Sequence, residues 1–260
     1  MEVVLMADDE SILAKPTPEP DGELRYGPED EHVADLWLPA EAAAVGTGTP
    51  LVLLVHGGFW RPAYDRVHTR HMAAALRDAG WPVAALEYRR VPGTPEATTD
   101  DVRLALREVP SQPALGAGHL RTVLMGHSAG GQLVLWAASV CPPGRLLGTV
   151  ALSPVTDLAA ADVAGLGGGA VRAFLGTSPA ARPDLDPLRL DTPDTPVTLV
   201  HGAEDATVPL ALSHTYAAAH PSTRLVAVPK ADHYDVIDPS SVAWQHVTAE
   251  LTSLSRRRAL

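Results

Sequence analysis

Residues 126–131 read Gly-His-Ser-Ala-Gly-Gly and follow a short apolar run at 121–125. The run predicts a buried strand, and the good helix formers that come after the motif predict a helix. Glycine on both sides of the serine permits a tight turn that lifts the Ser128 hydroxyl clear of its own backbone. The turn also directs the amide of Ala129 and the positive end of the helix at the atom that Ser128 attacks. The stretch therefore predicts a nucleophilic serine at the tip of a sheet.

Short apolar runs and helical patterns alternate along the rest of the chain. Residues 51–55, Leu-Val-Leu-Leu-Val, form an unbroken apolar run typical of strands that are buried on both faces of a parallel sheet. Strands are predicted at 24–26, 33–38, 51–55, 83–86, 121–125, 147–152, 197–200 and 224–228, and helices at 64–79, 98–109, 132–138, 158–163, 170–175, 210–219 and 242–254. This alternation predicts an α/β fold with a mostly parallel sheet of about eight strands and helices on both faces.

The segment 153–196 has no strand pattern over roughly forty residues, which is long for a compact connection. A glycine-rich stretch at 165–169 separates its two predicted helices. We interpret the segment as a small lid or cap insertion within a single domain. That domain is expected to span residues 1–260, with an irregular lead-in at 1–20, a linker at 40–50 and a solvated tail at 256–258.

Four polar clusters directly follow predicted strands, at 56–60, 126–131, 201–205 and 230–234. Ligands bind outside the carboxyl ends of the strands in parallel sheets. The four clusters are therefore expected to meet at one edge of the sheet and to form the functional site there.

The catalytic base has to be chosen among 11 histidines, because free serine is a poor nucleophile and needs a histidine within hydrogen-bond reach. His233 lies in a polar loop after the last predicted strand, where its side chain can swing over the sheet edge, and it is the predicted base. His127 lies within the turn itself and cannot easily face the hydroxyl of its neighbour. His56 is expected to brace the loop after its strand, and His201 is expected to order the loop of the acid.

Asp205 follows the strand at 197–200 and is the predicted acid, which orients His233 and stabilises the imidazolium that forms. Asp232 adjoins the histidine in sequence, but neighbours along a chain rarely point at each other's ring nitrogens. The alternatives for the acid are Glu204, Asp232, Asp235 and Asp157.

The stretch 56–60 reads His-Gly-Gly-Phe-Trp and is the predicted source of oxyanion donors. Its glycines let the backbone approach a substrate oxygen, so the amides of Gly58 and Phe59 are expected to join that of Ala129. The residues predicted to contact the substrate are Gly57, Trp60 and His127, with Phe59 beside them. A plain tight turn and core packing of the two aromatic residues are the simpler interpretations.

With these motifs the chain resembles the α/β-hydrolase superfamily over nearly its whole length. The stretch 56–60 resembles the His-Gly-Gly-x-Trp signature of kynurenine formamidase-like enzymes, neighbours of the hormone-sensitive-lipase-like esterases. The latter usually show His-Gly-Gly-Gly, from which Phe59 departs. The resemblance implies an α/β-hydrolase fold and a catalytic triad of Ser128, Asp205 and His233.

The motifs and the resemblance together predict a serine hydrolase that cleaves a small carboxylic ester or an aryl formamide through an acyl-enzyme. A peptidase of the prolyl-oligopeptidase type is one alternative, although such enzymes usually carry a further large domain. A non-catalytic protein that binds a small ligand on a hydrolase scaffold is an alternative of another class.

The formal charge of −11 on 260 residues argues against nucleic acid or an anionic membrane surface as a partner. The start of the chain does not read as a signal peptide, and no run approaches the roughly 20 apolar residues that span a bilayer. The single cysteine, Cys141, fits a reducing compartment. We therefore expect a cytoplasmic monomer or homodimer. No metal or organic cofactor is expected, because no ligand-spaced cluster is present in the sequence.

Overall fold

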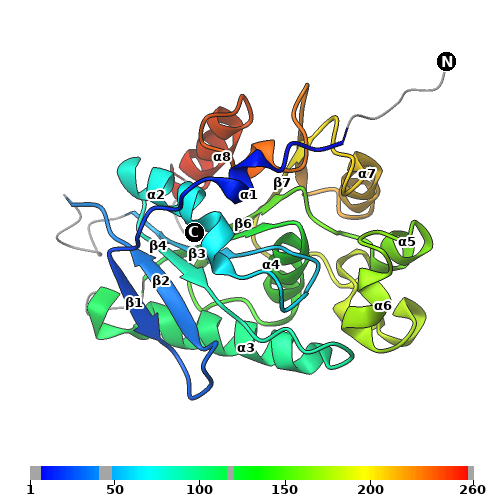
Figure 1. Ribbon diagram of the computed structural model, residues 1–260, viewed down its shortest axis with the longest axis horizontal. Helices are drawn as coiled ribbons and strands as arrows, with labels where there is room; N and C mark the ends of the chain where they lie inside the picture. Colours follow the sequence, from blue (N-terminus) through cyan, green and yellow to red (C-terminus); the bar gives the residue numbers. More distant parts are fainter. Residues whose placement is uncertain (1–6, 41–48, 116–119, 257–260) are drawn as a thin grey trace.

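The computed structural model describes residues 7–40, 49–115 and 120–256, and an eight-stranded sheet forms its centre (Figure 1). The strands are β1 (Gly22–Arg25), β2 (Val33–Trp37), β3 (Leu51–Val55), β4 (Val83–Leu86), β5 (Thr122–His127), β6 (Leu146–Leu152), β7 (Val197–Gly202) and β8 (Arg224–Val228). Their order in the sheet is β1-β2-β4-β3-β5-β6-β7-β8. The pairs β1–β2 and β2–β4 are antiparallel, and the other neighbours are parallel. The predicted fold class is confirmed.

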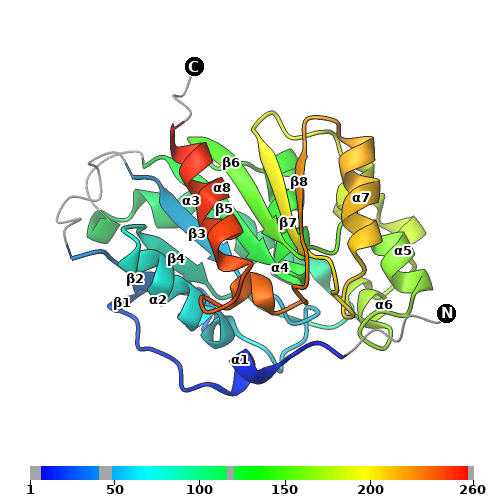
Figure 2. The ribbon, with the colours of Figure 1, turned by 90° about the horizontal axis from the view of Figure 1, so that it is seen from above.

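Helices cover both faces of the sheet (Figure 2). They are α1 (Ser11–Ala14), α2 (Arg70–Asp78), α3 (Pro95–Glu108), α4 (Ala129–Val140), α5 (Leu158–Val163), α6 (Ala170–Leu175), α7 (Leu210–Ala219) and α8 (Trp244–Arg256). Apolar residues of α2 and α8 belong to the core on one face, and those of α3, α4 and α7 belong to the core on the other.

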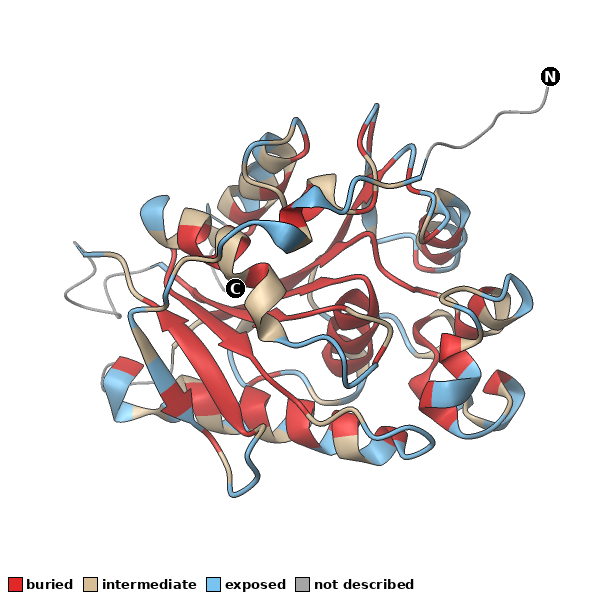
Figure 3. Ribbon diagram, in the orientation of Figure 1, coloured by how far each residue is buried: buried red, intermediate tan, exposed pale blue. Residues whose placement is uncertain are grey.

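The central strand β3 shows why an unbroken apolar run is needed there. Leu51, Leu53 and Val55 point into the core with α3 and α4, while Val52 and Leu54 point into the core with α2 and α8. Side chains alternate between the two faces of a strand, so a strand covered on both faces buries every residue. All five residues are fully buried, in line with the burial of the central strands in Figure 3.

Several element boundaries differ from the prediction for local reasons. The helix expected at 64–79 is divided into a 3-10 turn at Arg66–Thr69 and α2, and Asp65 caps the turn by accepting a hydrogen bond from the amide of Val67. The helix expected at 98–109 begins earlier, at Pro95, because proline suits the first helical position. Most of the linker at 40–50 and all but the first residue of the tail at 256–258 lie outside the described residues.

The segment 153–196 contains α5, α6 and three short 3-10 turns and lies beside the loop that follows β3. Phe174 stacks on Trp60 at a centroid distance of 4.7 Å, and the amide of Gly93 donates to the carbonyl of Ala173 at 2.7 Å. Arg61 donates a hydrogen bond to the carbonyl of Gly167. These contacts place the segment next to the carboxyl edge of the sheet; its action as a lid stays a prediction.

Candidate active site

Ser128 occupies the turn between β5 and α4 with a left-handed backbone, φ 56° and ψ −117°. A non-glycine residue in a sparsely populated backbone region costs on the order of 1–3 kcal/mol and marks functional sites. The turn is also crowded. A Cβ atom at Gly130 would lie 2.1 Å from the carbonyl oxygen of Val55, and one at Gly126 would lie 2.2 Å from that of Gly130. Glycine is therefore required at both positions, as the sequence pattern predicts.

His233 and Asp205 come together from the loops after β8 and β7. The Nδ1 atom of His233 lies 2.8 Å from Oδ2 of Asp205, and both side chains are almost completely buried. The other carboxylate oxygen of Asp205 accepts hydrogen bonds from the amides of Thr207 at 3.0 Å and Val208 at 2.6 Å. These bonds fix the position of the carboxylate, which in turn holds the His233 ring through Nδ1. The other ring nitrogen, Nε2, is not used in this contact.

A second histidine supports the same carboxylate. His201 Nε2 lies 3.1 Å from Asp205 Oδ2 and 2.8 Å from the carbonyl of Val208, while its Nδ1 lies 2.8 Å from the hydroxyl of Ser213. Burial acts to raise the pKa of Asp205, but the hydrogen bonds from His201 and His233 outweigh it and hold this pKa below its ordinary value. Asp205 is thus kept ionised, and the expectation that His201 orders the acid loop is confirmed.

The alternative acids have other partners. Asp232 accepts hydrogen bonds from the amides of Tyr234 and Asp235, and Asp235 in turn accepts one from the amide of Asp232. Asp157 caps α5 through the amide of Ala160. The remaining alternative, the residue before Asp205, has an exposed side chain. Of the five carboxylates considered, Asp205 alone is within hydrogen-bond distance of His233 among the described residues.

One cavity of about 120 Å³ brings most of the predicted site together. It contains the predicted nucleophile and base, Ser128 and His233, and two residues of the predicted oxyanion loop, Gly58 and Phe59. The complete lining is Glu10, Leu13, Gly58, Phe59, Arg61, Tyr64, His68, His127, Ser128, Thr207, His233 and Tyr234. Residues of the clusters 56–60, 126–131 and 230–234 therefore meet in one cavity, and the cluster 201–205 reaches it through the contact of Asp205 with His233.

The loop after β3 has an unusual backbone: Gly58, Phe59 and Trp60 have φ values of 102°, 52° and 54°. Successive amides in such a conformation form concave groups of donors that suit a negative oxygen. Among the described residues, no acceptor is recorded for the amides of Gly58, Phe59 and Ala129. These amides are thus available as the oxyanion donors that the sequence predicts.

His56 braces this loop as expected. Its Nδ1 lies 2.8 Å from the carbonyl of Gly57 and its Nε2 lies 3.0 Å from Oε1 of Glu87, and the ring stacks on Tyr88. Burial acts to raise the pKa of Glu87, but the hydrogen bond from His56 and the charge of Arg90 lower it below its ordinary value. The buried carboxylate of Glu87 therefore holds His56, and through it the loop 56–60, in place.

Two residues predicted to contact the substrate, Gly57 and Trp60, are not on the described wall of the cavity. Trp60 is buried, and its Nε1 donates to Oε1 of Gln132 at 3.1 Å. Gln132 Nε2 donates to the carbonyl of Leu185 at 2.8 Å. The aromatic ring therefore packs between the oxyanion loop, α4 and the segment 153–196, whereas His127 does line the cavity.

The N-terminal segment contributes to the site, which the sequence does not reveal. Asp8 accepts hydrogen bonds from the amides of Ala206 at 3.0 Å and His233 at 3.5 Å, and the amide of Asp9 donates to Asp232 at 2.7 Å. These contacts hold the segment along the sheet edge, with Glu10 and Leu13 in the cavity wall. Arg61, Tyr64, His68 and Thr207 are also additions, and no motif in the chain singles them out, whereas Tyr234 belongs to the predicted polar cluster 230–234.

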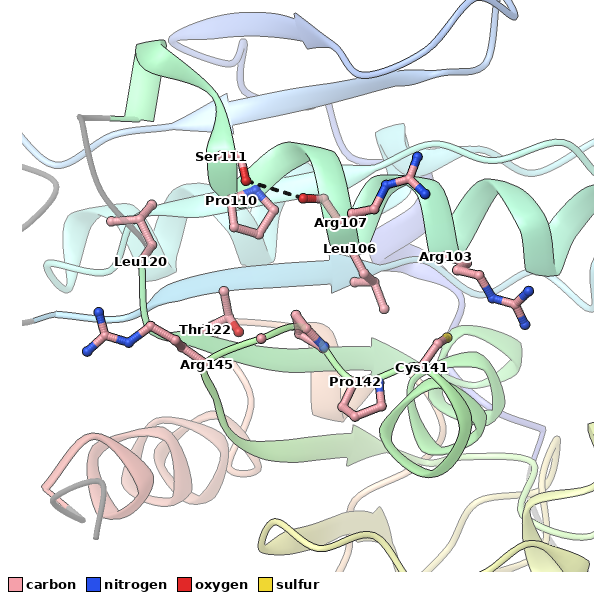
Figure 4. Close-up of a pocket in the computed structure, with 12 residues that line it drawn as sticks. Arg103, Leu106, Arg107, Pro110, Ser111, Leu120, Thr122, Cys141, Pro142 and Arg145 are labelled. Atoms are coloured by element: carbon pink, nitrogen blue, oxygen red, sulfur yellow. Dashed lines mark hydrogen bonds between the residues drawn. The ribbon is translucent and has the colours of Figure 1, made fainter.

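A larger cavity, of about 760 Å³, lies at the opposite end of the sheet, between the end of α3 and the loop after α4 (Figure 4). Thr122, at the start of β5, is in its wall together with Arg103, Arg107 and Cys141. Burial raises the pKa of Cys141, which disfavours a nucleophilic thiolate. The described lining of this larger cavity contains no histidine and no carboxylate.

Within the described residues, no group of three or more histidine, cysteine or acidic side chains is arranged to hold a metal ion. None of the helices that the structure describes has the length and apolar character needed to cross a bilayer.

Residues 52–233 match the alpha/beta hydrolase fold family, and the chain belongs to that family. Among solved structures, esterase B of Lactobacillus rhamnosis is 20% identical with a TM-score of 0.75, over 96% of this chain and 97% of that one. Esterase 2 of Thermogutta terrifontis is 20% identical with a TM-score of 0.71, over 90% and 94%. At these identities the similarity shows the fold.

Two other proteins match this chain with higher sequence identity. A protein of Silicibacter sp. TM1040, described as a thioesterase, is 27% identical with a TM-score of 0.69, over 87% of this chain and 84% of that one. A non-reducing polyketide synthase of Aspergillus calidoustus is 29% identical in an alignment of 152 residues that covers 52% of this chain and 6% of the synthase. The chain thus matches only a small part of that much longer protein.

Proposed function

We propose that the protein is a serine hydrolase of small carboxylic esters that works through an acyl-enzyme. The observation that carries the proposal is that Ser128, on its left-handed turn, lines the same cavity as His233, whose Nδ1 is held 2.8 Å from the ionised Asp205. A base that is oriented by a buried carboxylate and lies near a serine at a strand-to-helix turn is the arrangement needed for nucleophilic catalysis.

In the proposed reaction Ser128 Oγ attacks the ester carbonyl while His233 Nε2 takes its proton. The amides of Gly58, Phe59 and Ala129 stabilise the negative oxygen that forms. His233 then protonates the leaving alcohol, and the acyl group stays on Ser128. Water, activated by the same histidine, cleaves the acyl-enzyme and releases the acid.

A small acyl group fits the site best. The cavity of about 120 Å³ is below the range of about 300–1,000 Å³ typical of sites for drug-sized ligands. Acetyl and other short acyl groups, and the formyl group of an aryl formamide, are therefore the proposed range. The similarity to proteins described as esterases and as a thioesterase supports acyl transfer, and the His-Gly-Gly-x-Trp resemblance supports the formamide.

The test combines turnover with labelling of the serine. The wild-type protein should hydrolyse p-nitrophenyl acetate faster than p-nitrophenyl octanoate and should react with a fluorophosphonate probe at Ser128. Ser128→Ala should lose both properties while keeping its circular dichroism spectrum. Activity retained by Ser128→Ala would refute the proposal, and a wild-type protein that binds esters without reacting with the probe would favour a binding function. The rate of hydrolysis of N-formylkynurenine would show whether the protein also cleaves aryl formamides.

A further inference from the structure

The oxyanion loop, residues 56–60, has a backbone that needs support from other elements. Phe59 and Trp60 are non-glycine residues with φ values of 52° and 54°. A residue keeps such a sparsely populated conformation only where the surrounding structure over-determines it. Trp60 is held by its stacking on Phe174 and its hydrogen bond to Gln132. Phe59, whose amide is a proposed oxyanion donor, therefore requires a support of its own.

The side chain of Phe59 finds this support in the glycine-rich stretch 165–169 of the segment 153–196. The ring packs so closely against the backbone of Gly167 that a Cβ atom there would lie 2.9 Å from Cγ and Cδ1 of the ring. The guanidinium of Arg61 lies over the same ring, with its carbon 5.8 Å from the ring centroid, and donates a hydrogen bond to the carbonyl of Gly167. Gly167 therefore contacts Phe59 directly and also through Arg61.

Arg61 connects this contact to the start of the oxyanion loop. Its backbone amide donates to the carbonyl of Gly58 at 3.0 Å, while its side chain bonds to Gly167. Gly58, Phe59 and Arg61 line the cavity that contains Ser128, whereas Gly167 is not on the described wall of that cavity. Any effect of Gly167 on the reaction therefore has to pass through the oxyanion loop.

We propose that Gly167 is a positioning residue of the oxyanion hole, which holds the amides of Gly58 and Phe59 where the negative oxygen forms. The inference rests on the proposed ester hydrolysis and assigns the segment 153–196 a part in the chemical step itself. The negative oxygen forms in both acylation and deacylation, and its donors act in the transition state more than on the bound ester. Loss of this support therefore lowers kcat and leaves KM nearly unchanged.

The test compares Gly167→Ala with Gly165→Ala. The φ values are 57° and 64°, so the backbone strain of an alanine is matched at the two positions. A Cβ at Gly165 meets no described atom within 4 Å, whereas one at Gly167 has to be about 0.6 Å further from the Phe59 ring to reach ordinary van der Waals contact. A misplacement of about 1 Å near the reacting atoms costs about 100-fold, so this smaller displacement is expected to cost about 10-fold.

The kinetic result expected on p-nitrophenyl acetate is a kcat for Gly167→Ala about 10-fold below that of Gly165→Ala, with KM values within about twofold. The oxyanion hole is also measured without turnover, through the inhibition constant of trifluoroacetone. A serine adds to this ketone and forms a tetrahedral adduct with a negative oxygen, so its inhibition constant should rise by about the same factor as kcat falls. Active sites are counted by complete fluorophosphonate labelling, so that a smaller folded fraction is not taken for a lower rate.

A double substitution shows whether the effect passes through the Phe59 ring. Phe59→Ala removes the ring and keeps the backbone amide. In the Phe59→Ala background, Gly167→Ala should lower kcat by less than about twofold, because no ring is left for the new Cβ to displace. Additive losses from the two substitutions would overturn the inference.

Two further outcomes would also overturn it. One is an equal kcat and an equal inhibition constant in Gly167→Ala and Gly165→Ala. The other is a raised KM at unchanged kcat, which would make the Phe59 ring a wall for the substrate instead of a support for the amides.

If Gly167→Ala does not fold, Arg61→Met decides, because the exposed Arg61 side chain can be replaced without opening the core. This variant removes the donor to Gly167 and should lower kcat about 3-fold or more on an uncharged ester, with a matching rise in the inhibition constant. Unchanged values would overturn the inference. Fluorophosphonate labelling separates the two proposals. A wild-type protein that is not labelled contradicts the proposed function, whereas a labelled wild type with equal kinetics in the two glycine variants contradicts only this inference.

Discussion

Replacement of Gly130 by alanine is expected to lower both the catalytic rate and the stability of the fold. The new Cβ would lie 2.1 Å from the carbonyl oxygen of Val55 and 2.4 Å from that of His56, whereas real Cβ contacts essentially never fall below 3.0 Å. Both obstacles are backbone atoms of β3 and its loop, so the turn has to move away by about 1 Å. A displacement of this size at the reacting atoms costs about 100-fold in rate, and overpacking costs about 1–3 kcal/mol of stability.

The assay measures kcat/KM on p-nitrophenyl acetate, the rate of fluorophosphonate labelling and the midpoint of thermal unfolding. We expect Gly130→Ala to be folded, to label slowly and to lose about 100-fold in kcat/KM. Gly22→Ala is the control, because a Cβ at this position in β1 meets no atom within 4 Å. A Gly130→Ala protein with wild-type kcat/KM and labelling rate would refute the assignment of this turn as the nucleophile turn.

Three further outcomes are expected. Asp205→Asn should lower kcat by about 10⁴-fold, because an amide does not stabilise the imidazolium of His233. If Asp232→Asn lowered kcat by this factor and Asp205→Asn did not, Asp232 would be the acid instead of Asp205. Asp205 has a pKa below its unfolded value, so its contribution to stability is present above about pH 4 and is lost as the pH falls further. Urea unfolding from pH 7 to 3 should therefore show a steeper loss for the wild type than for Asp205→Asn, and parallel curves would contradict this. Leu13→Ala should enlarge the cavity and so raise the ratio of kcat/KM on p-nitrophenyl hexanoate to that on p-nitrophenyl acetate by about 10-fold. An unchanged ratio would show that the N-terminal segment does not limit the size of the substrate.

Much of the fold follows from local patterns in the sequence. The run 51–55 is a strand with the predicted ends because every residue is needed to fill one of two cores. The turn at Ser128 and the positions of Asp205 and His233 are also foreseeable, because glycine spacing and strand ends determine them locally.

Other parts of the site depend on contacts between distant residues that leave no local pattern. The amide of Asp9 bonds to Asp232 across 223 positions, and the lead-in at 1–20 contains no motif that reveals this contact. The position of Trp60 likewise depends on Phe174 and Gln132, which belong to other elements. A sequence motif identifies Trp60 as notable but does not show whether its ring contacts a substrate or the core.

The side chain of Gln132 has a consequence for engineering. Its amide oxygen accepts from Trp60 and its amide nitrogen donates to the carbonyl of Leu185, so one residue of α4 connects the loop 56–60 to the segment 153–196. Grafting either region alone from another hydrolase would leave half of this amide unpaired in the interior. Chimeras that exchange both regions together, along with the residue at position 132, should therefore express and fold better than chimeras that exchange one.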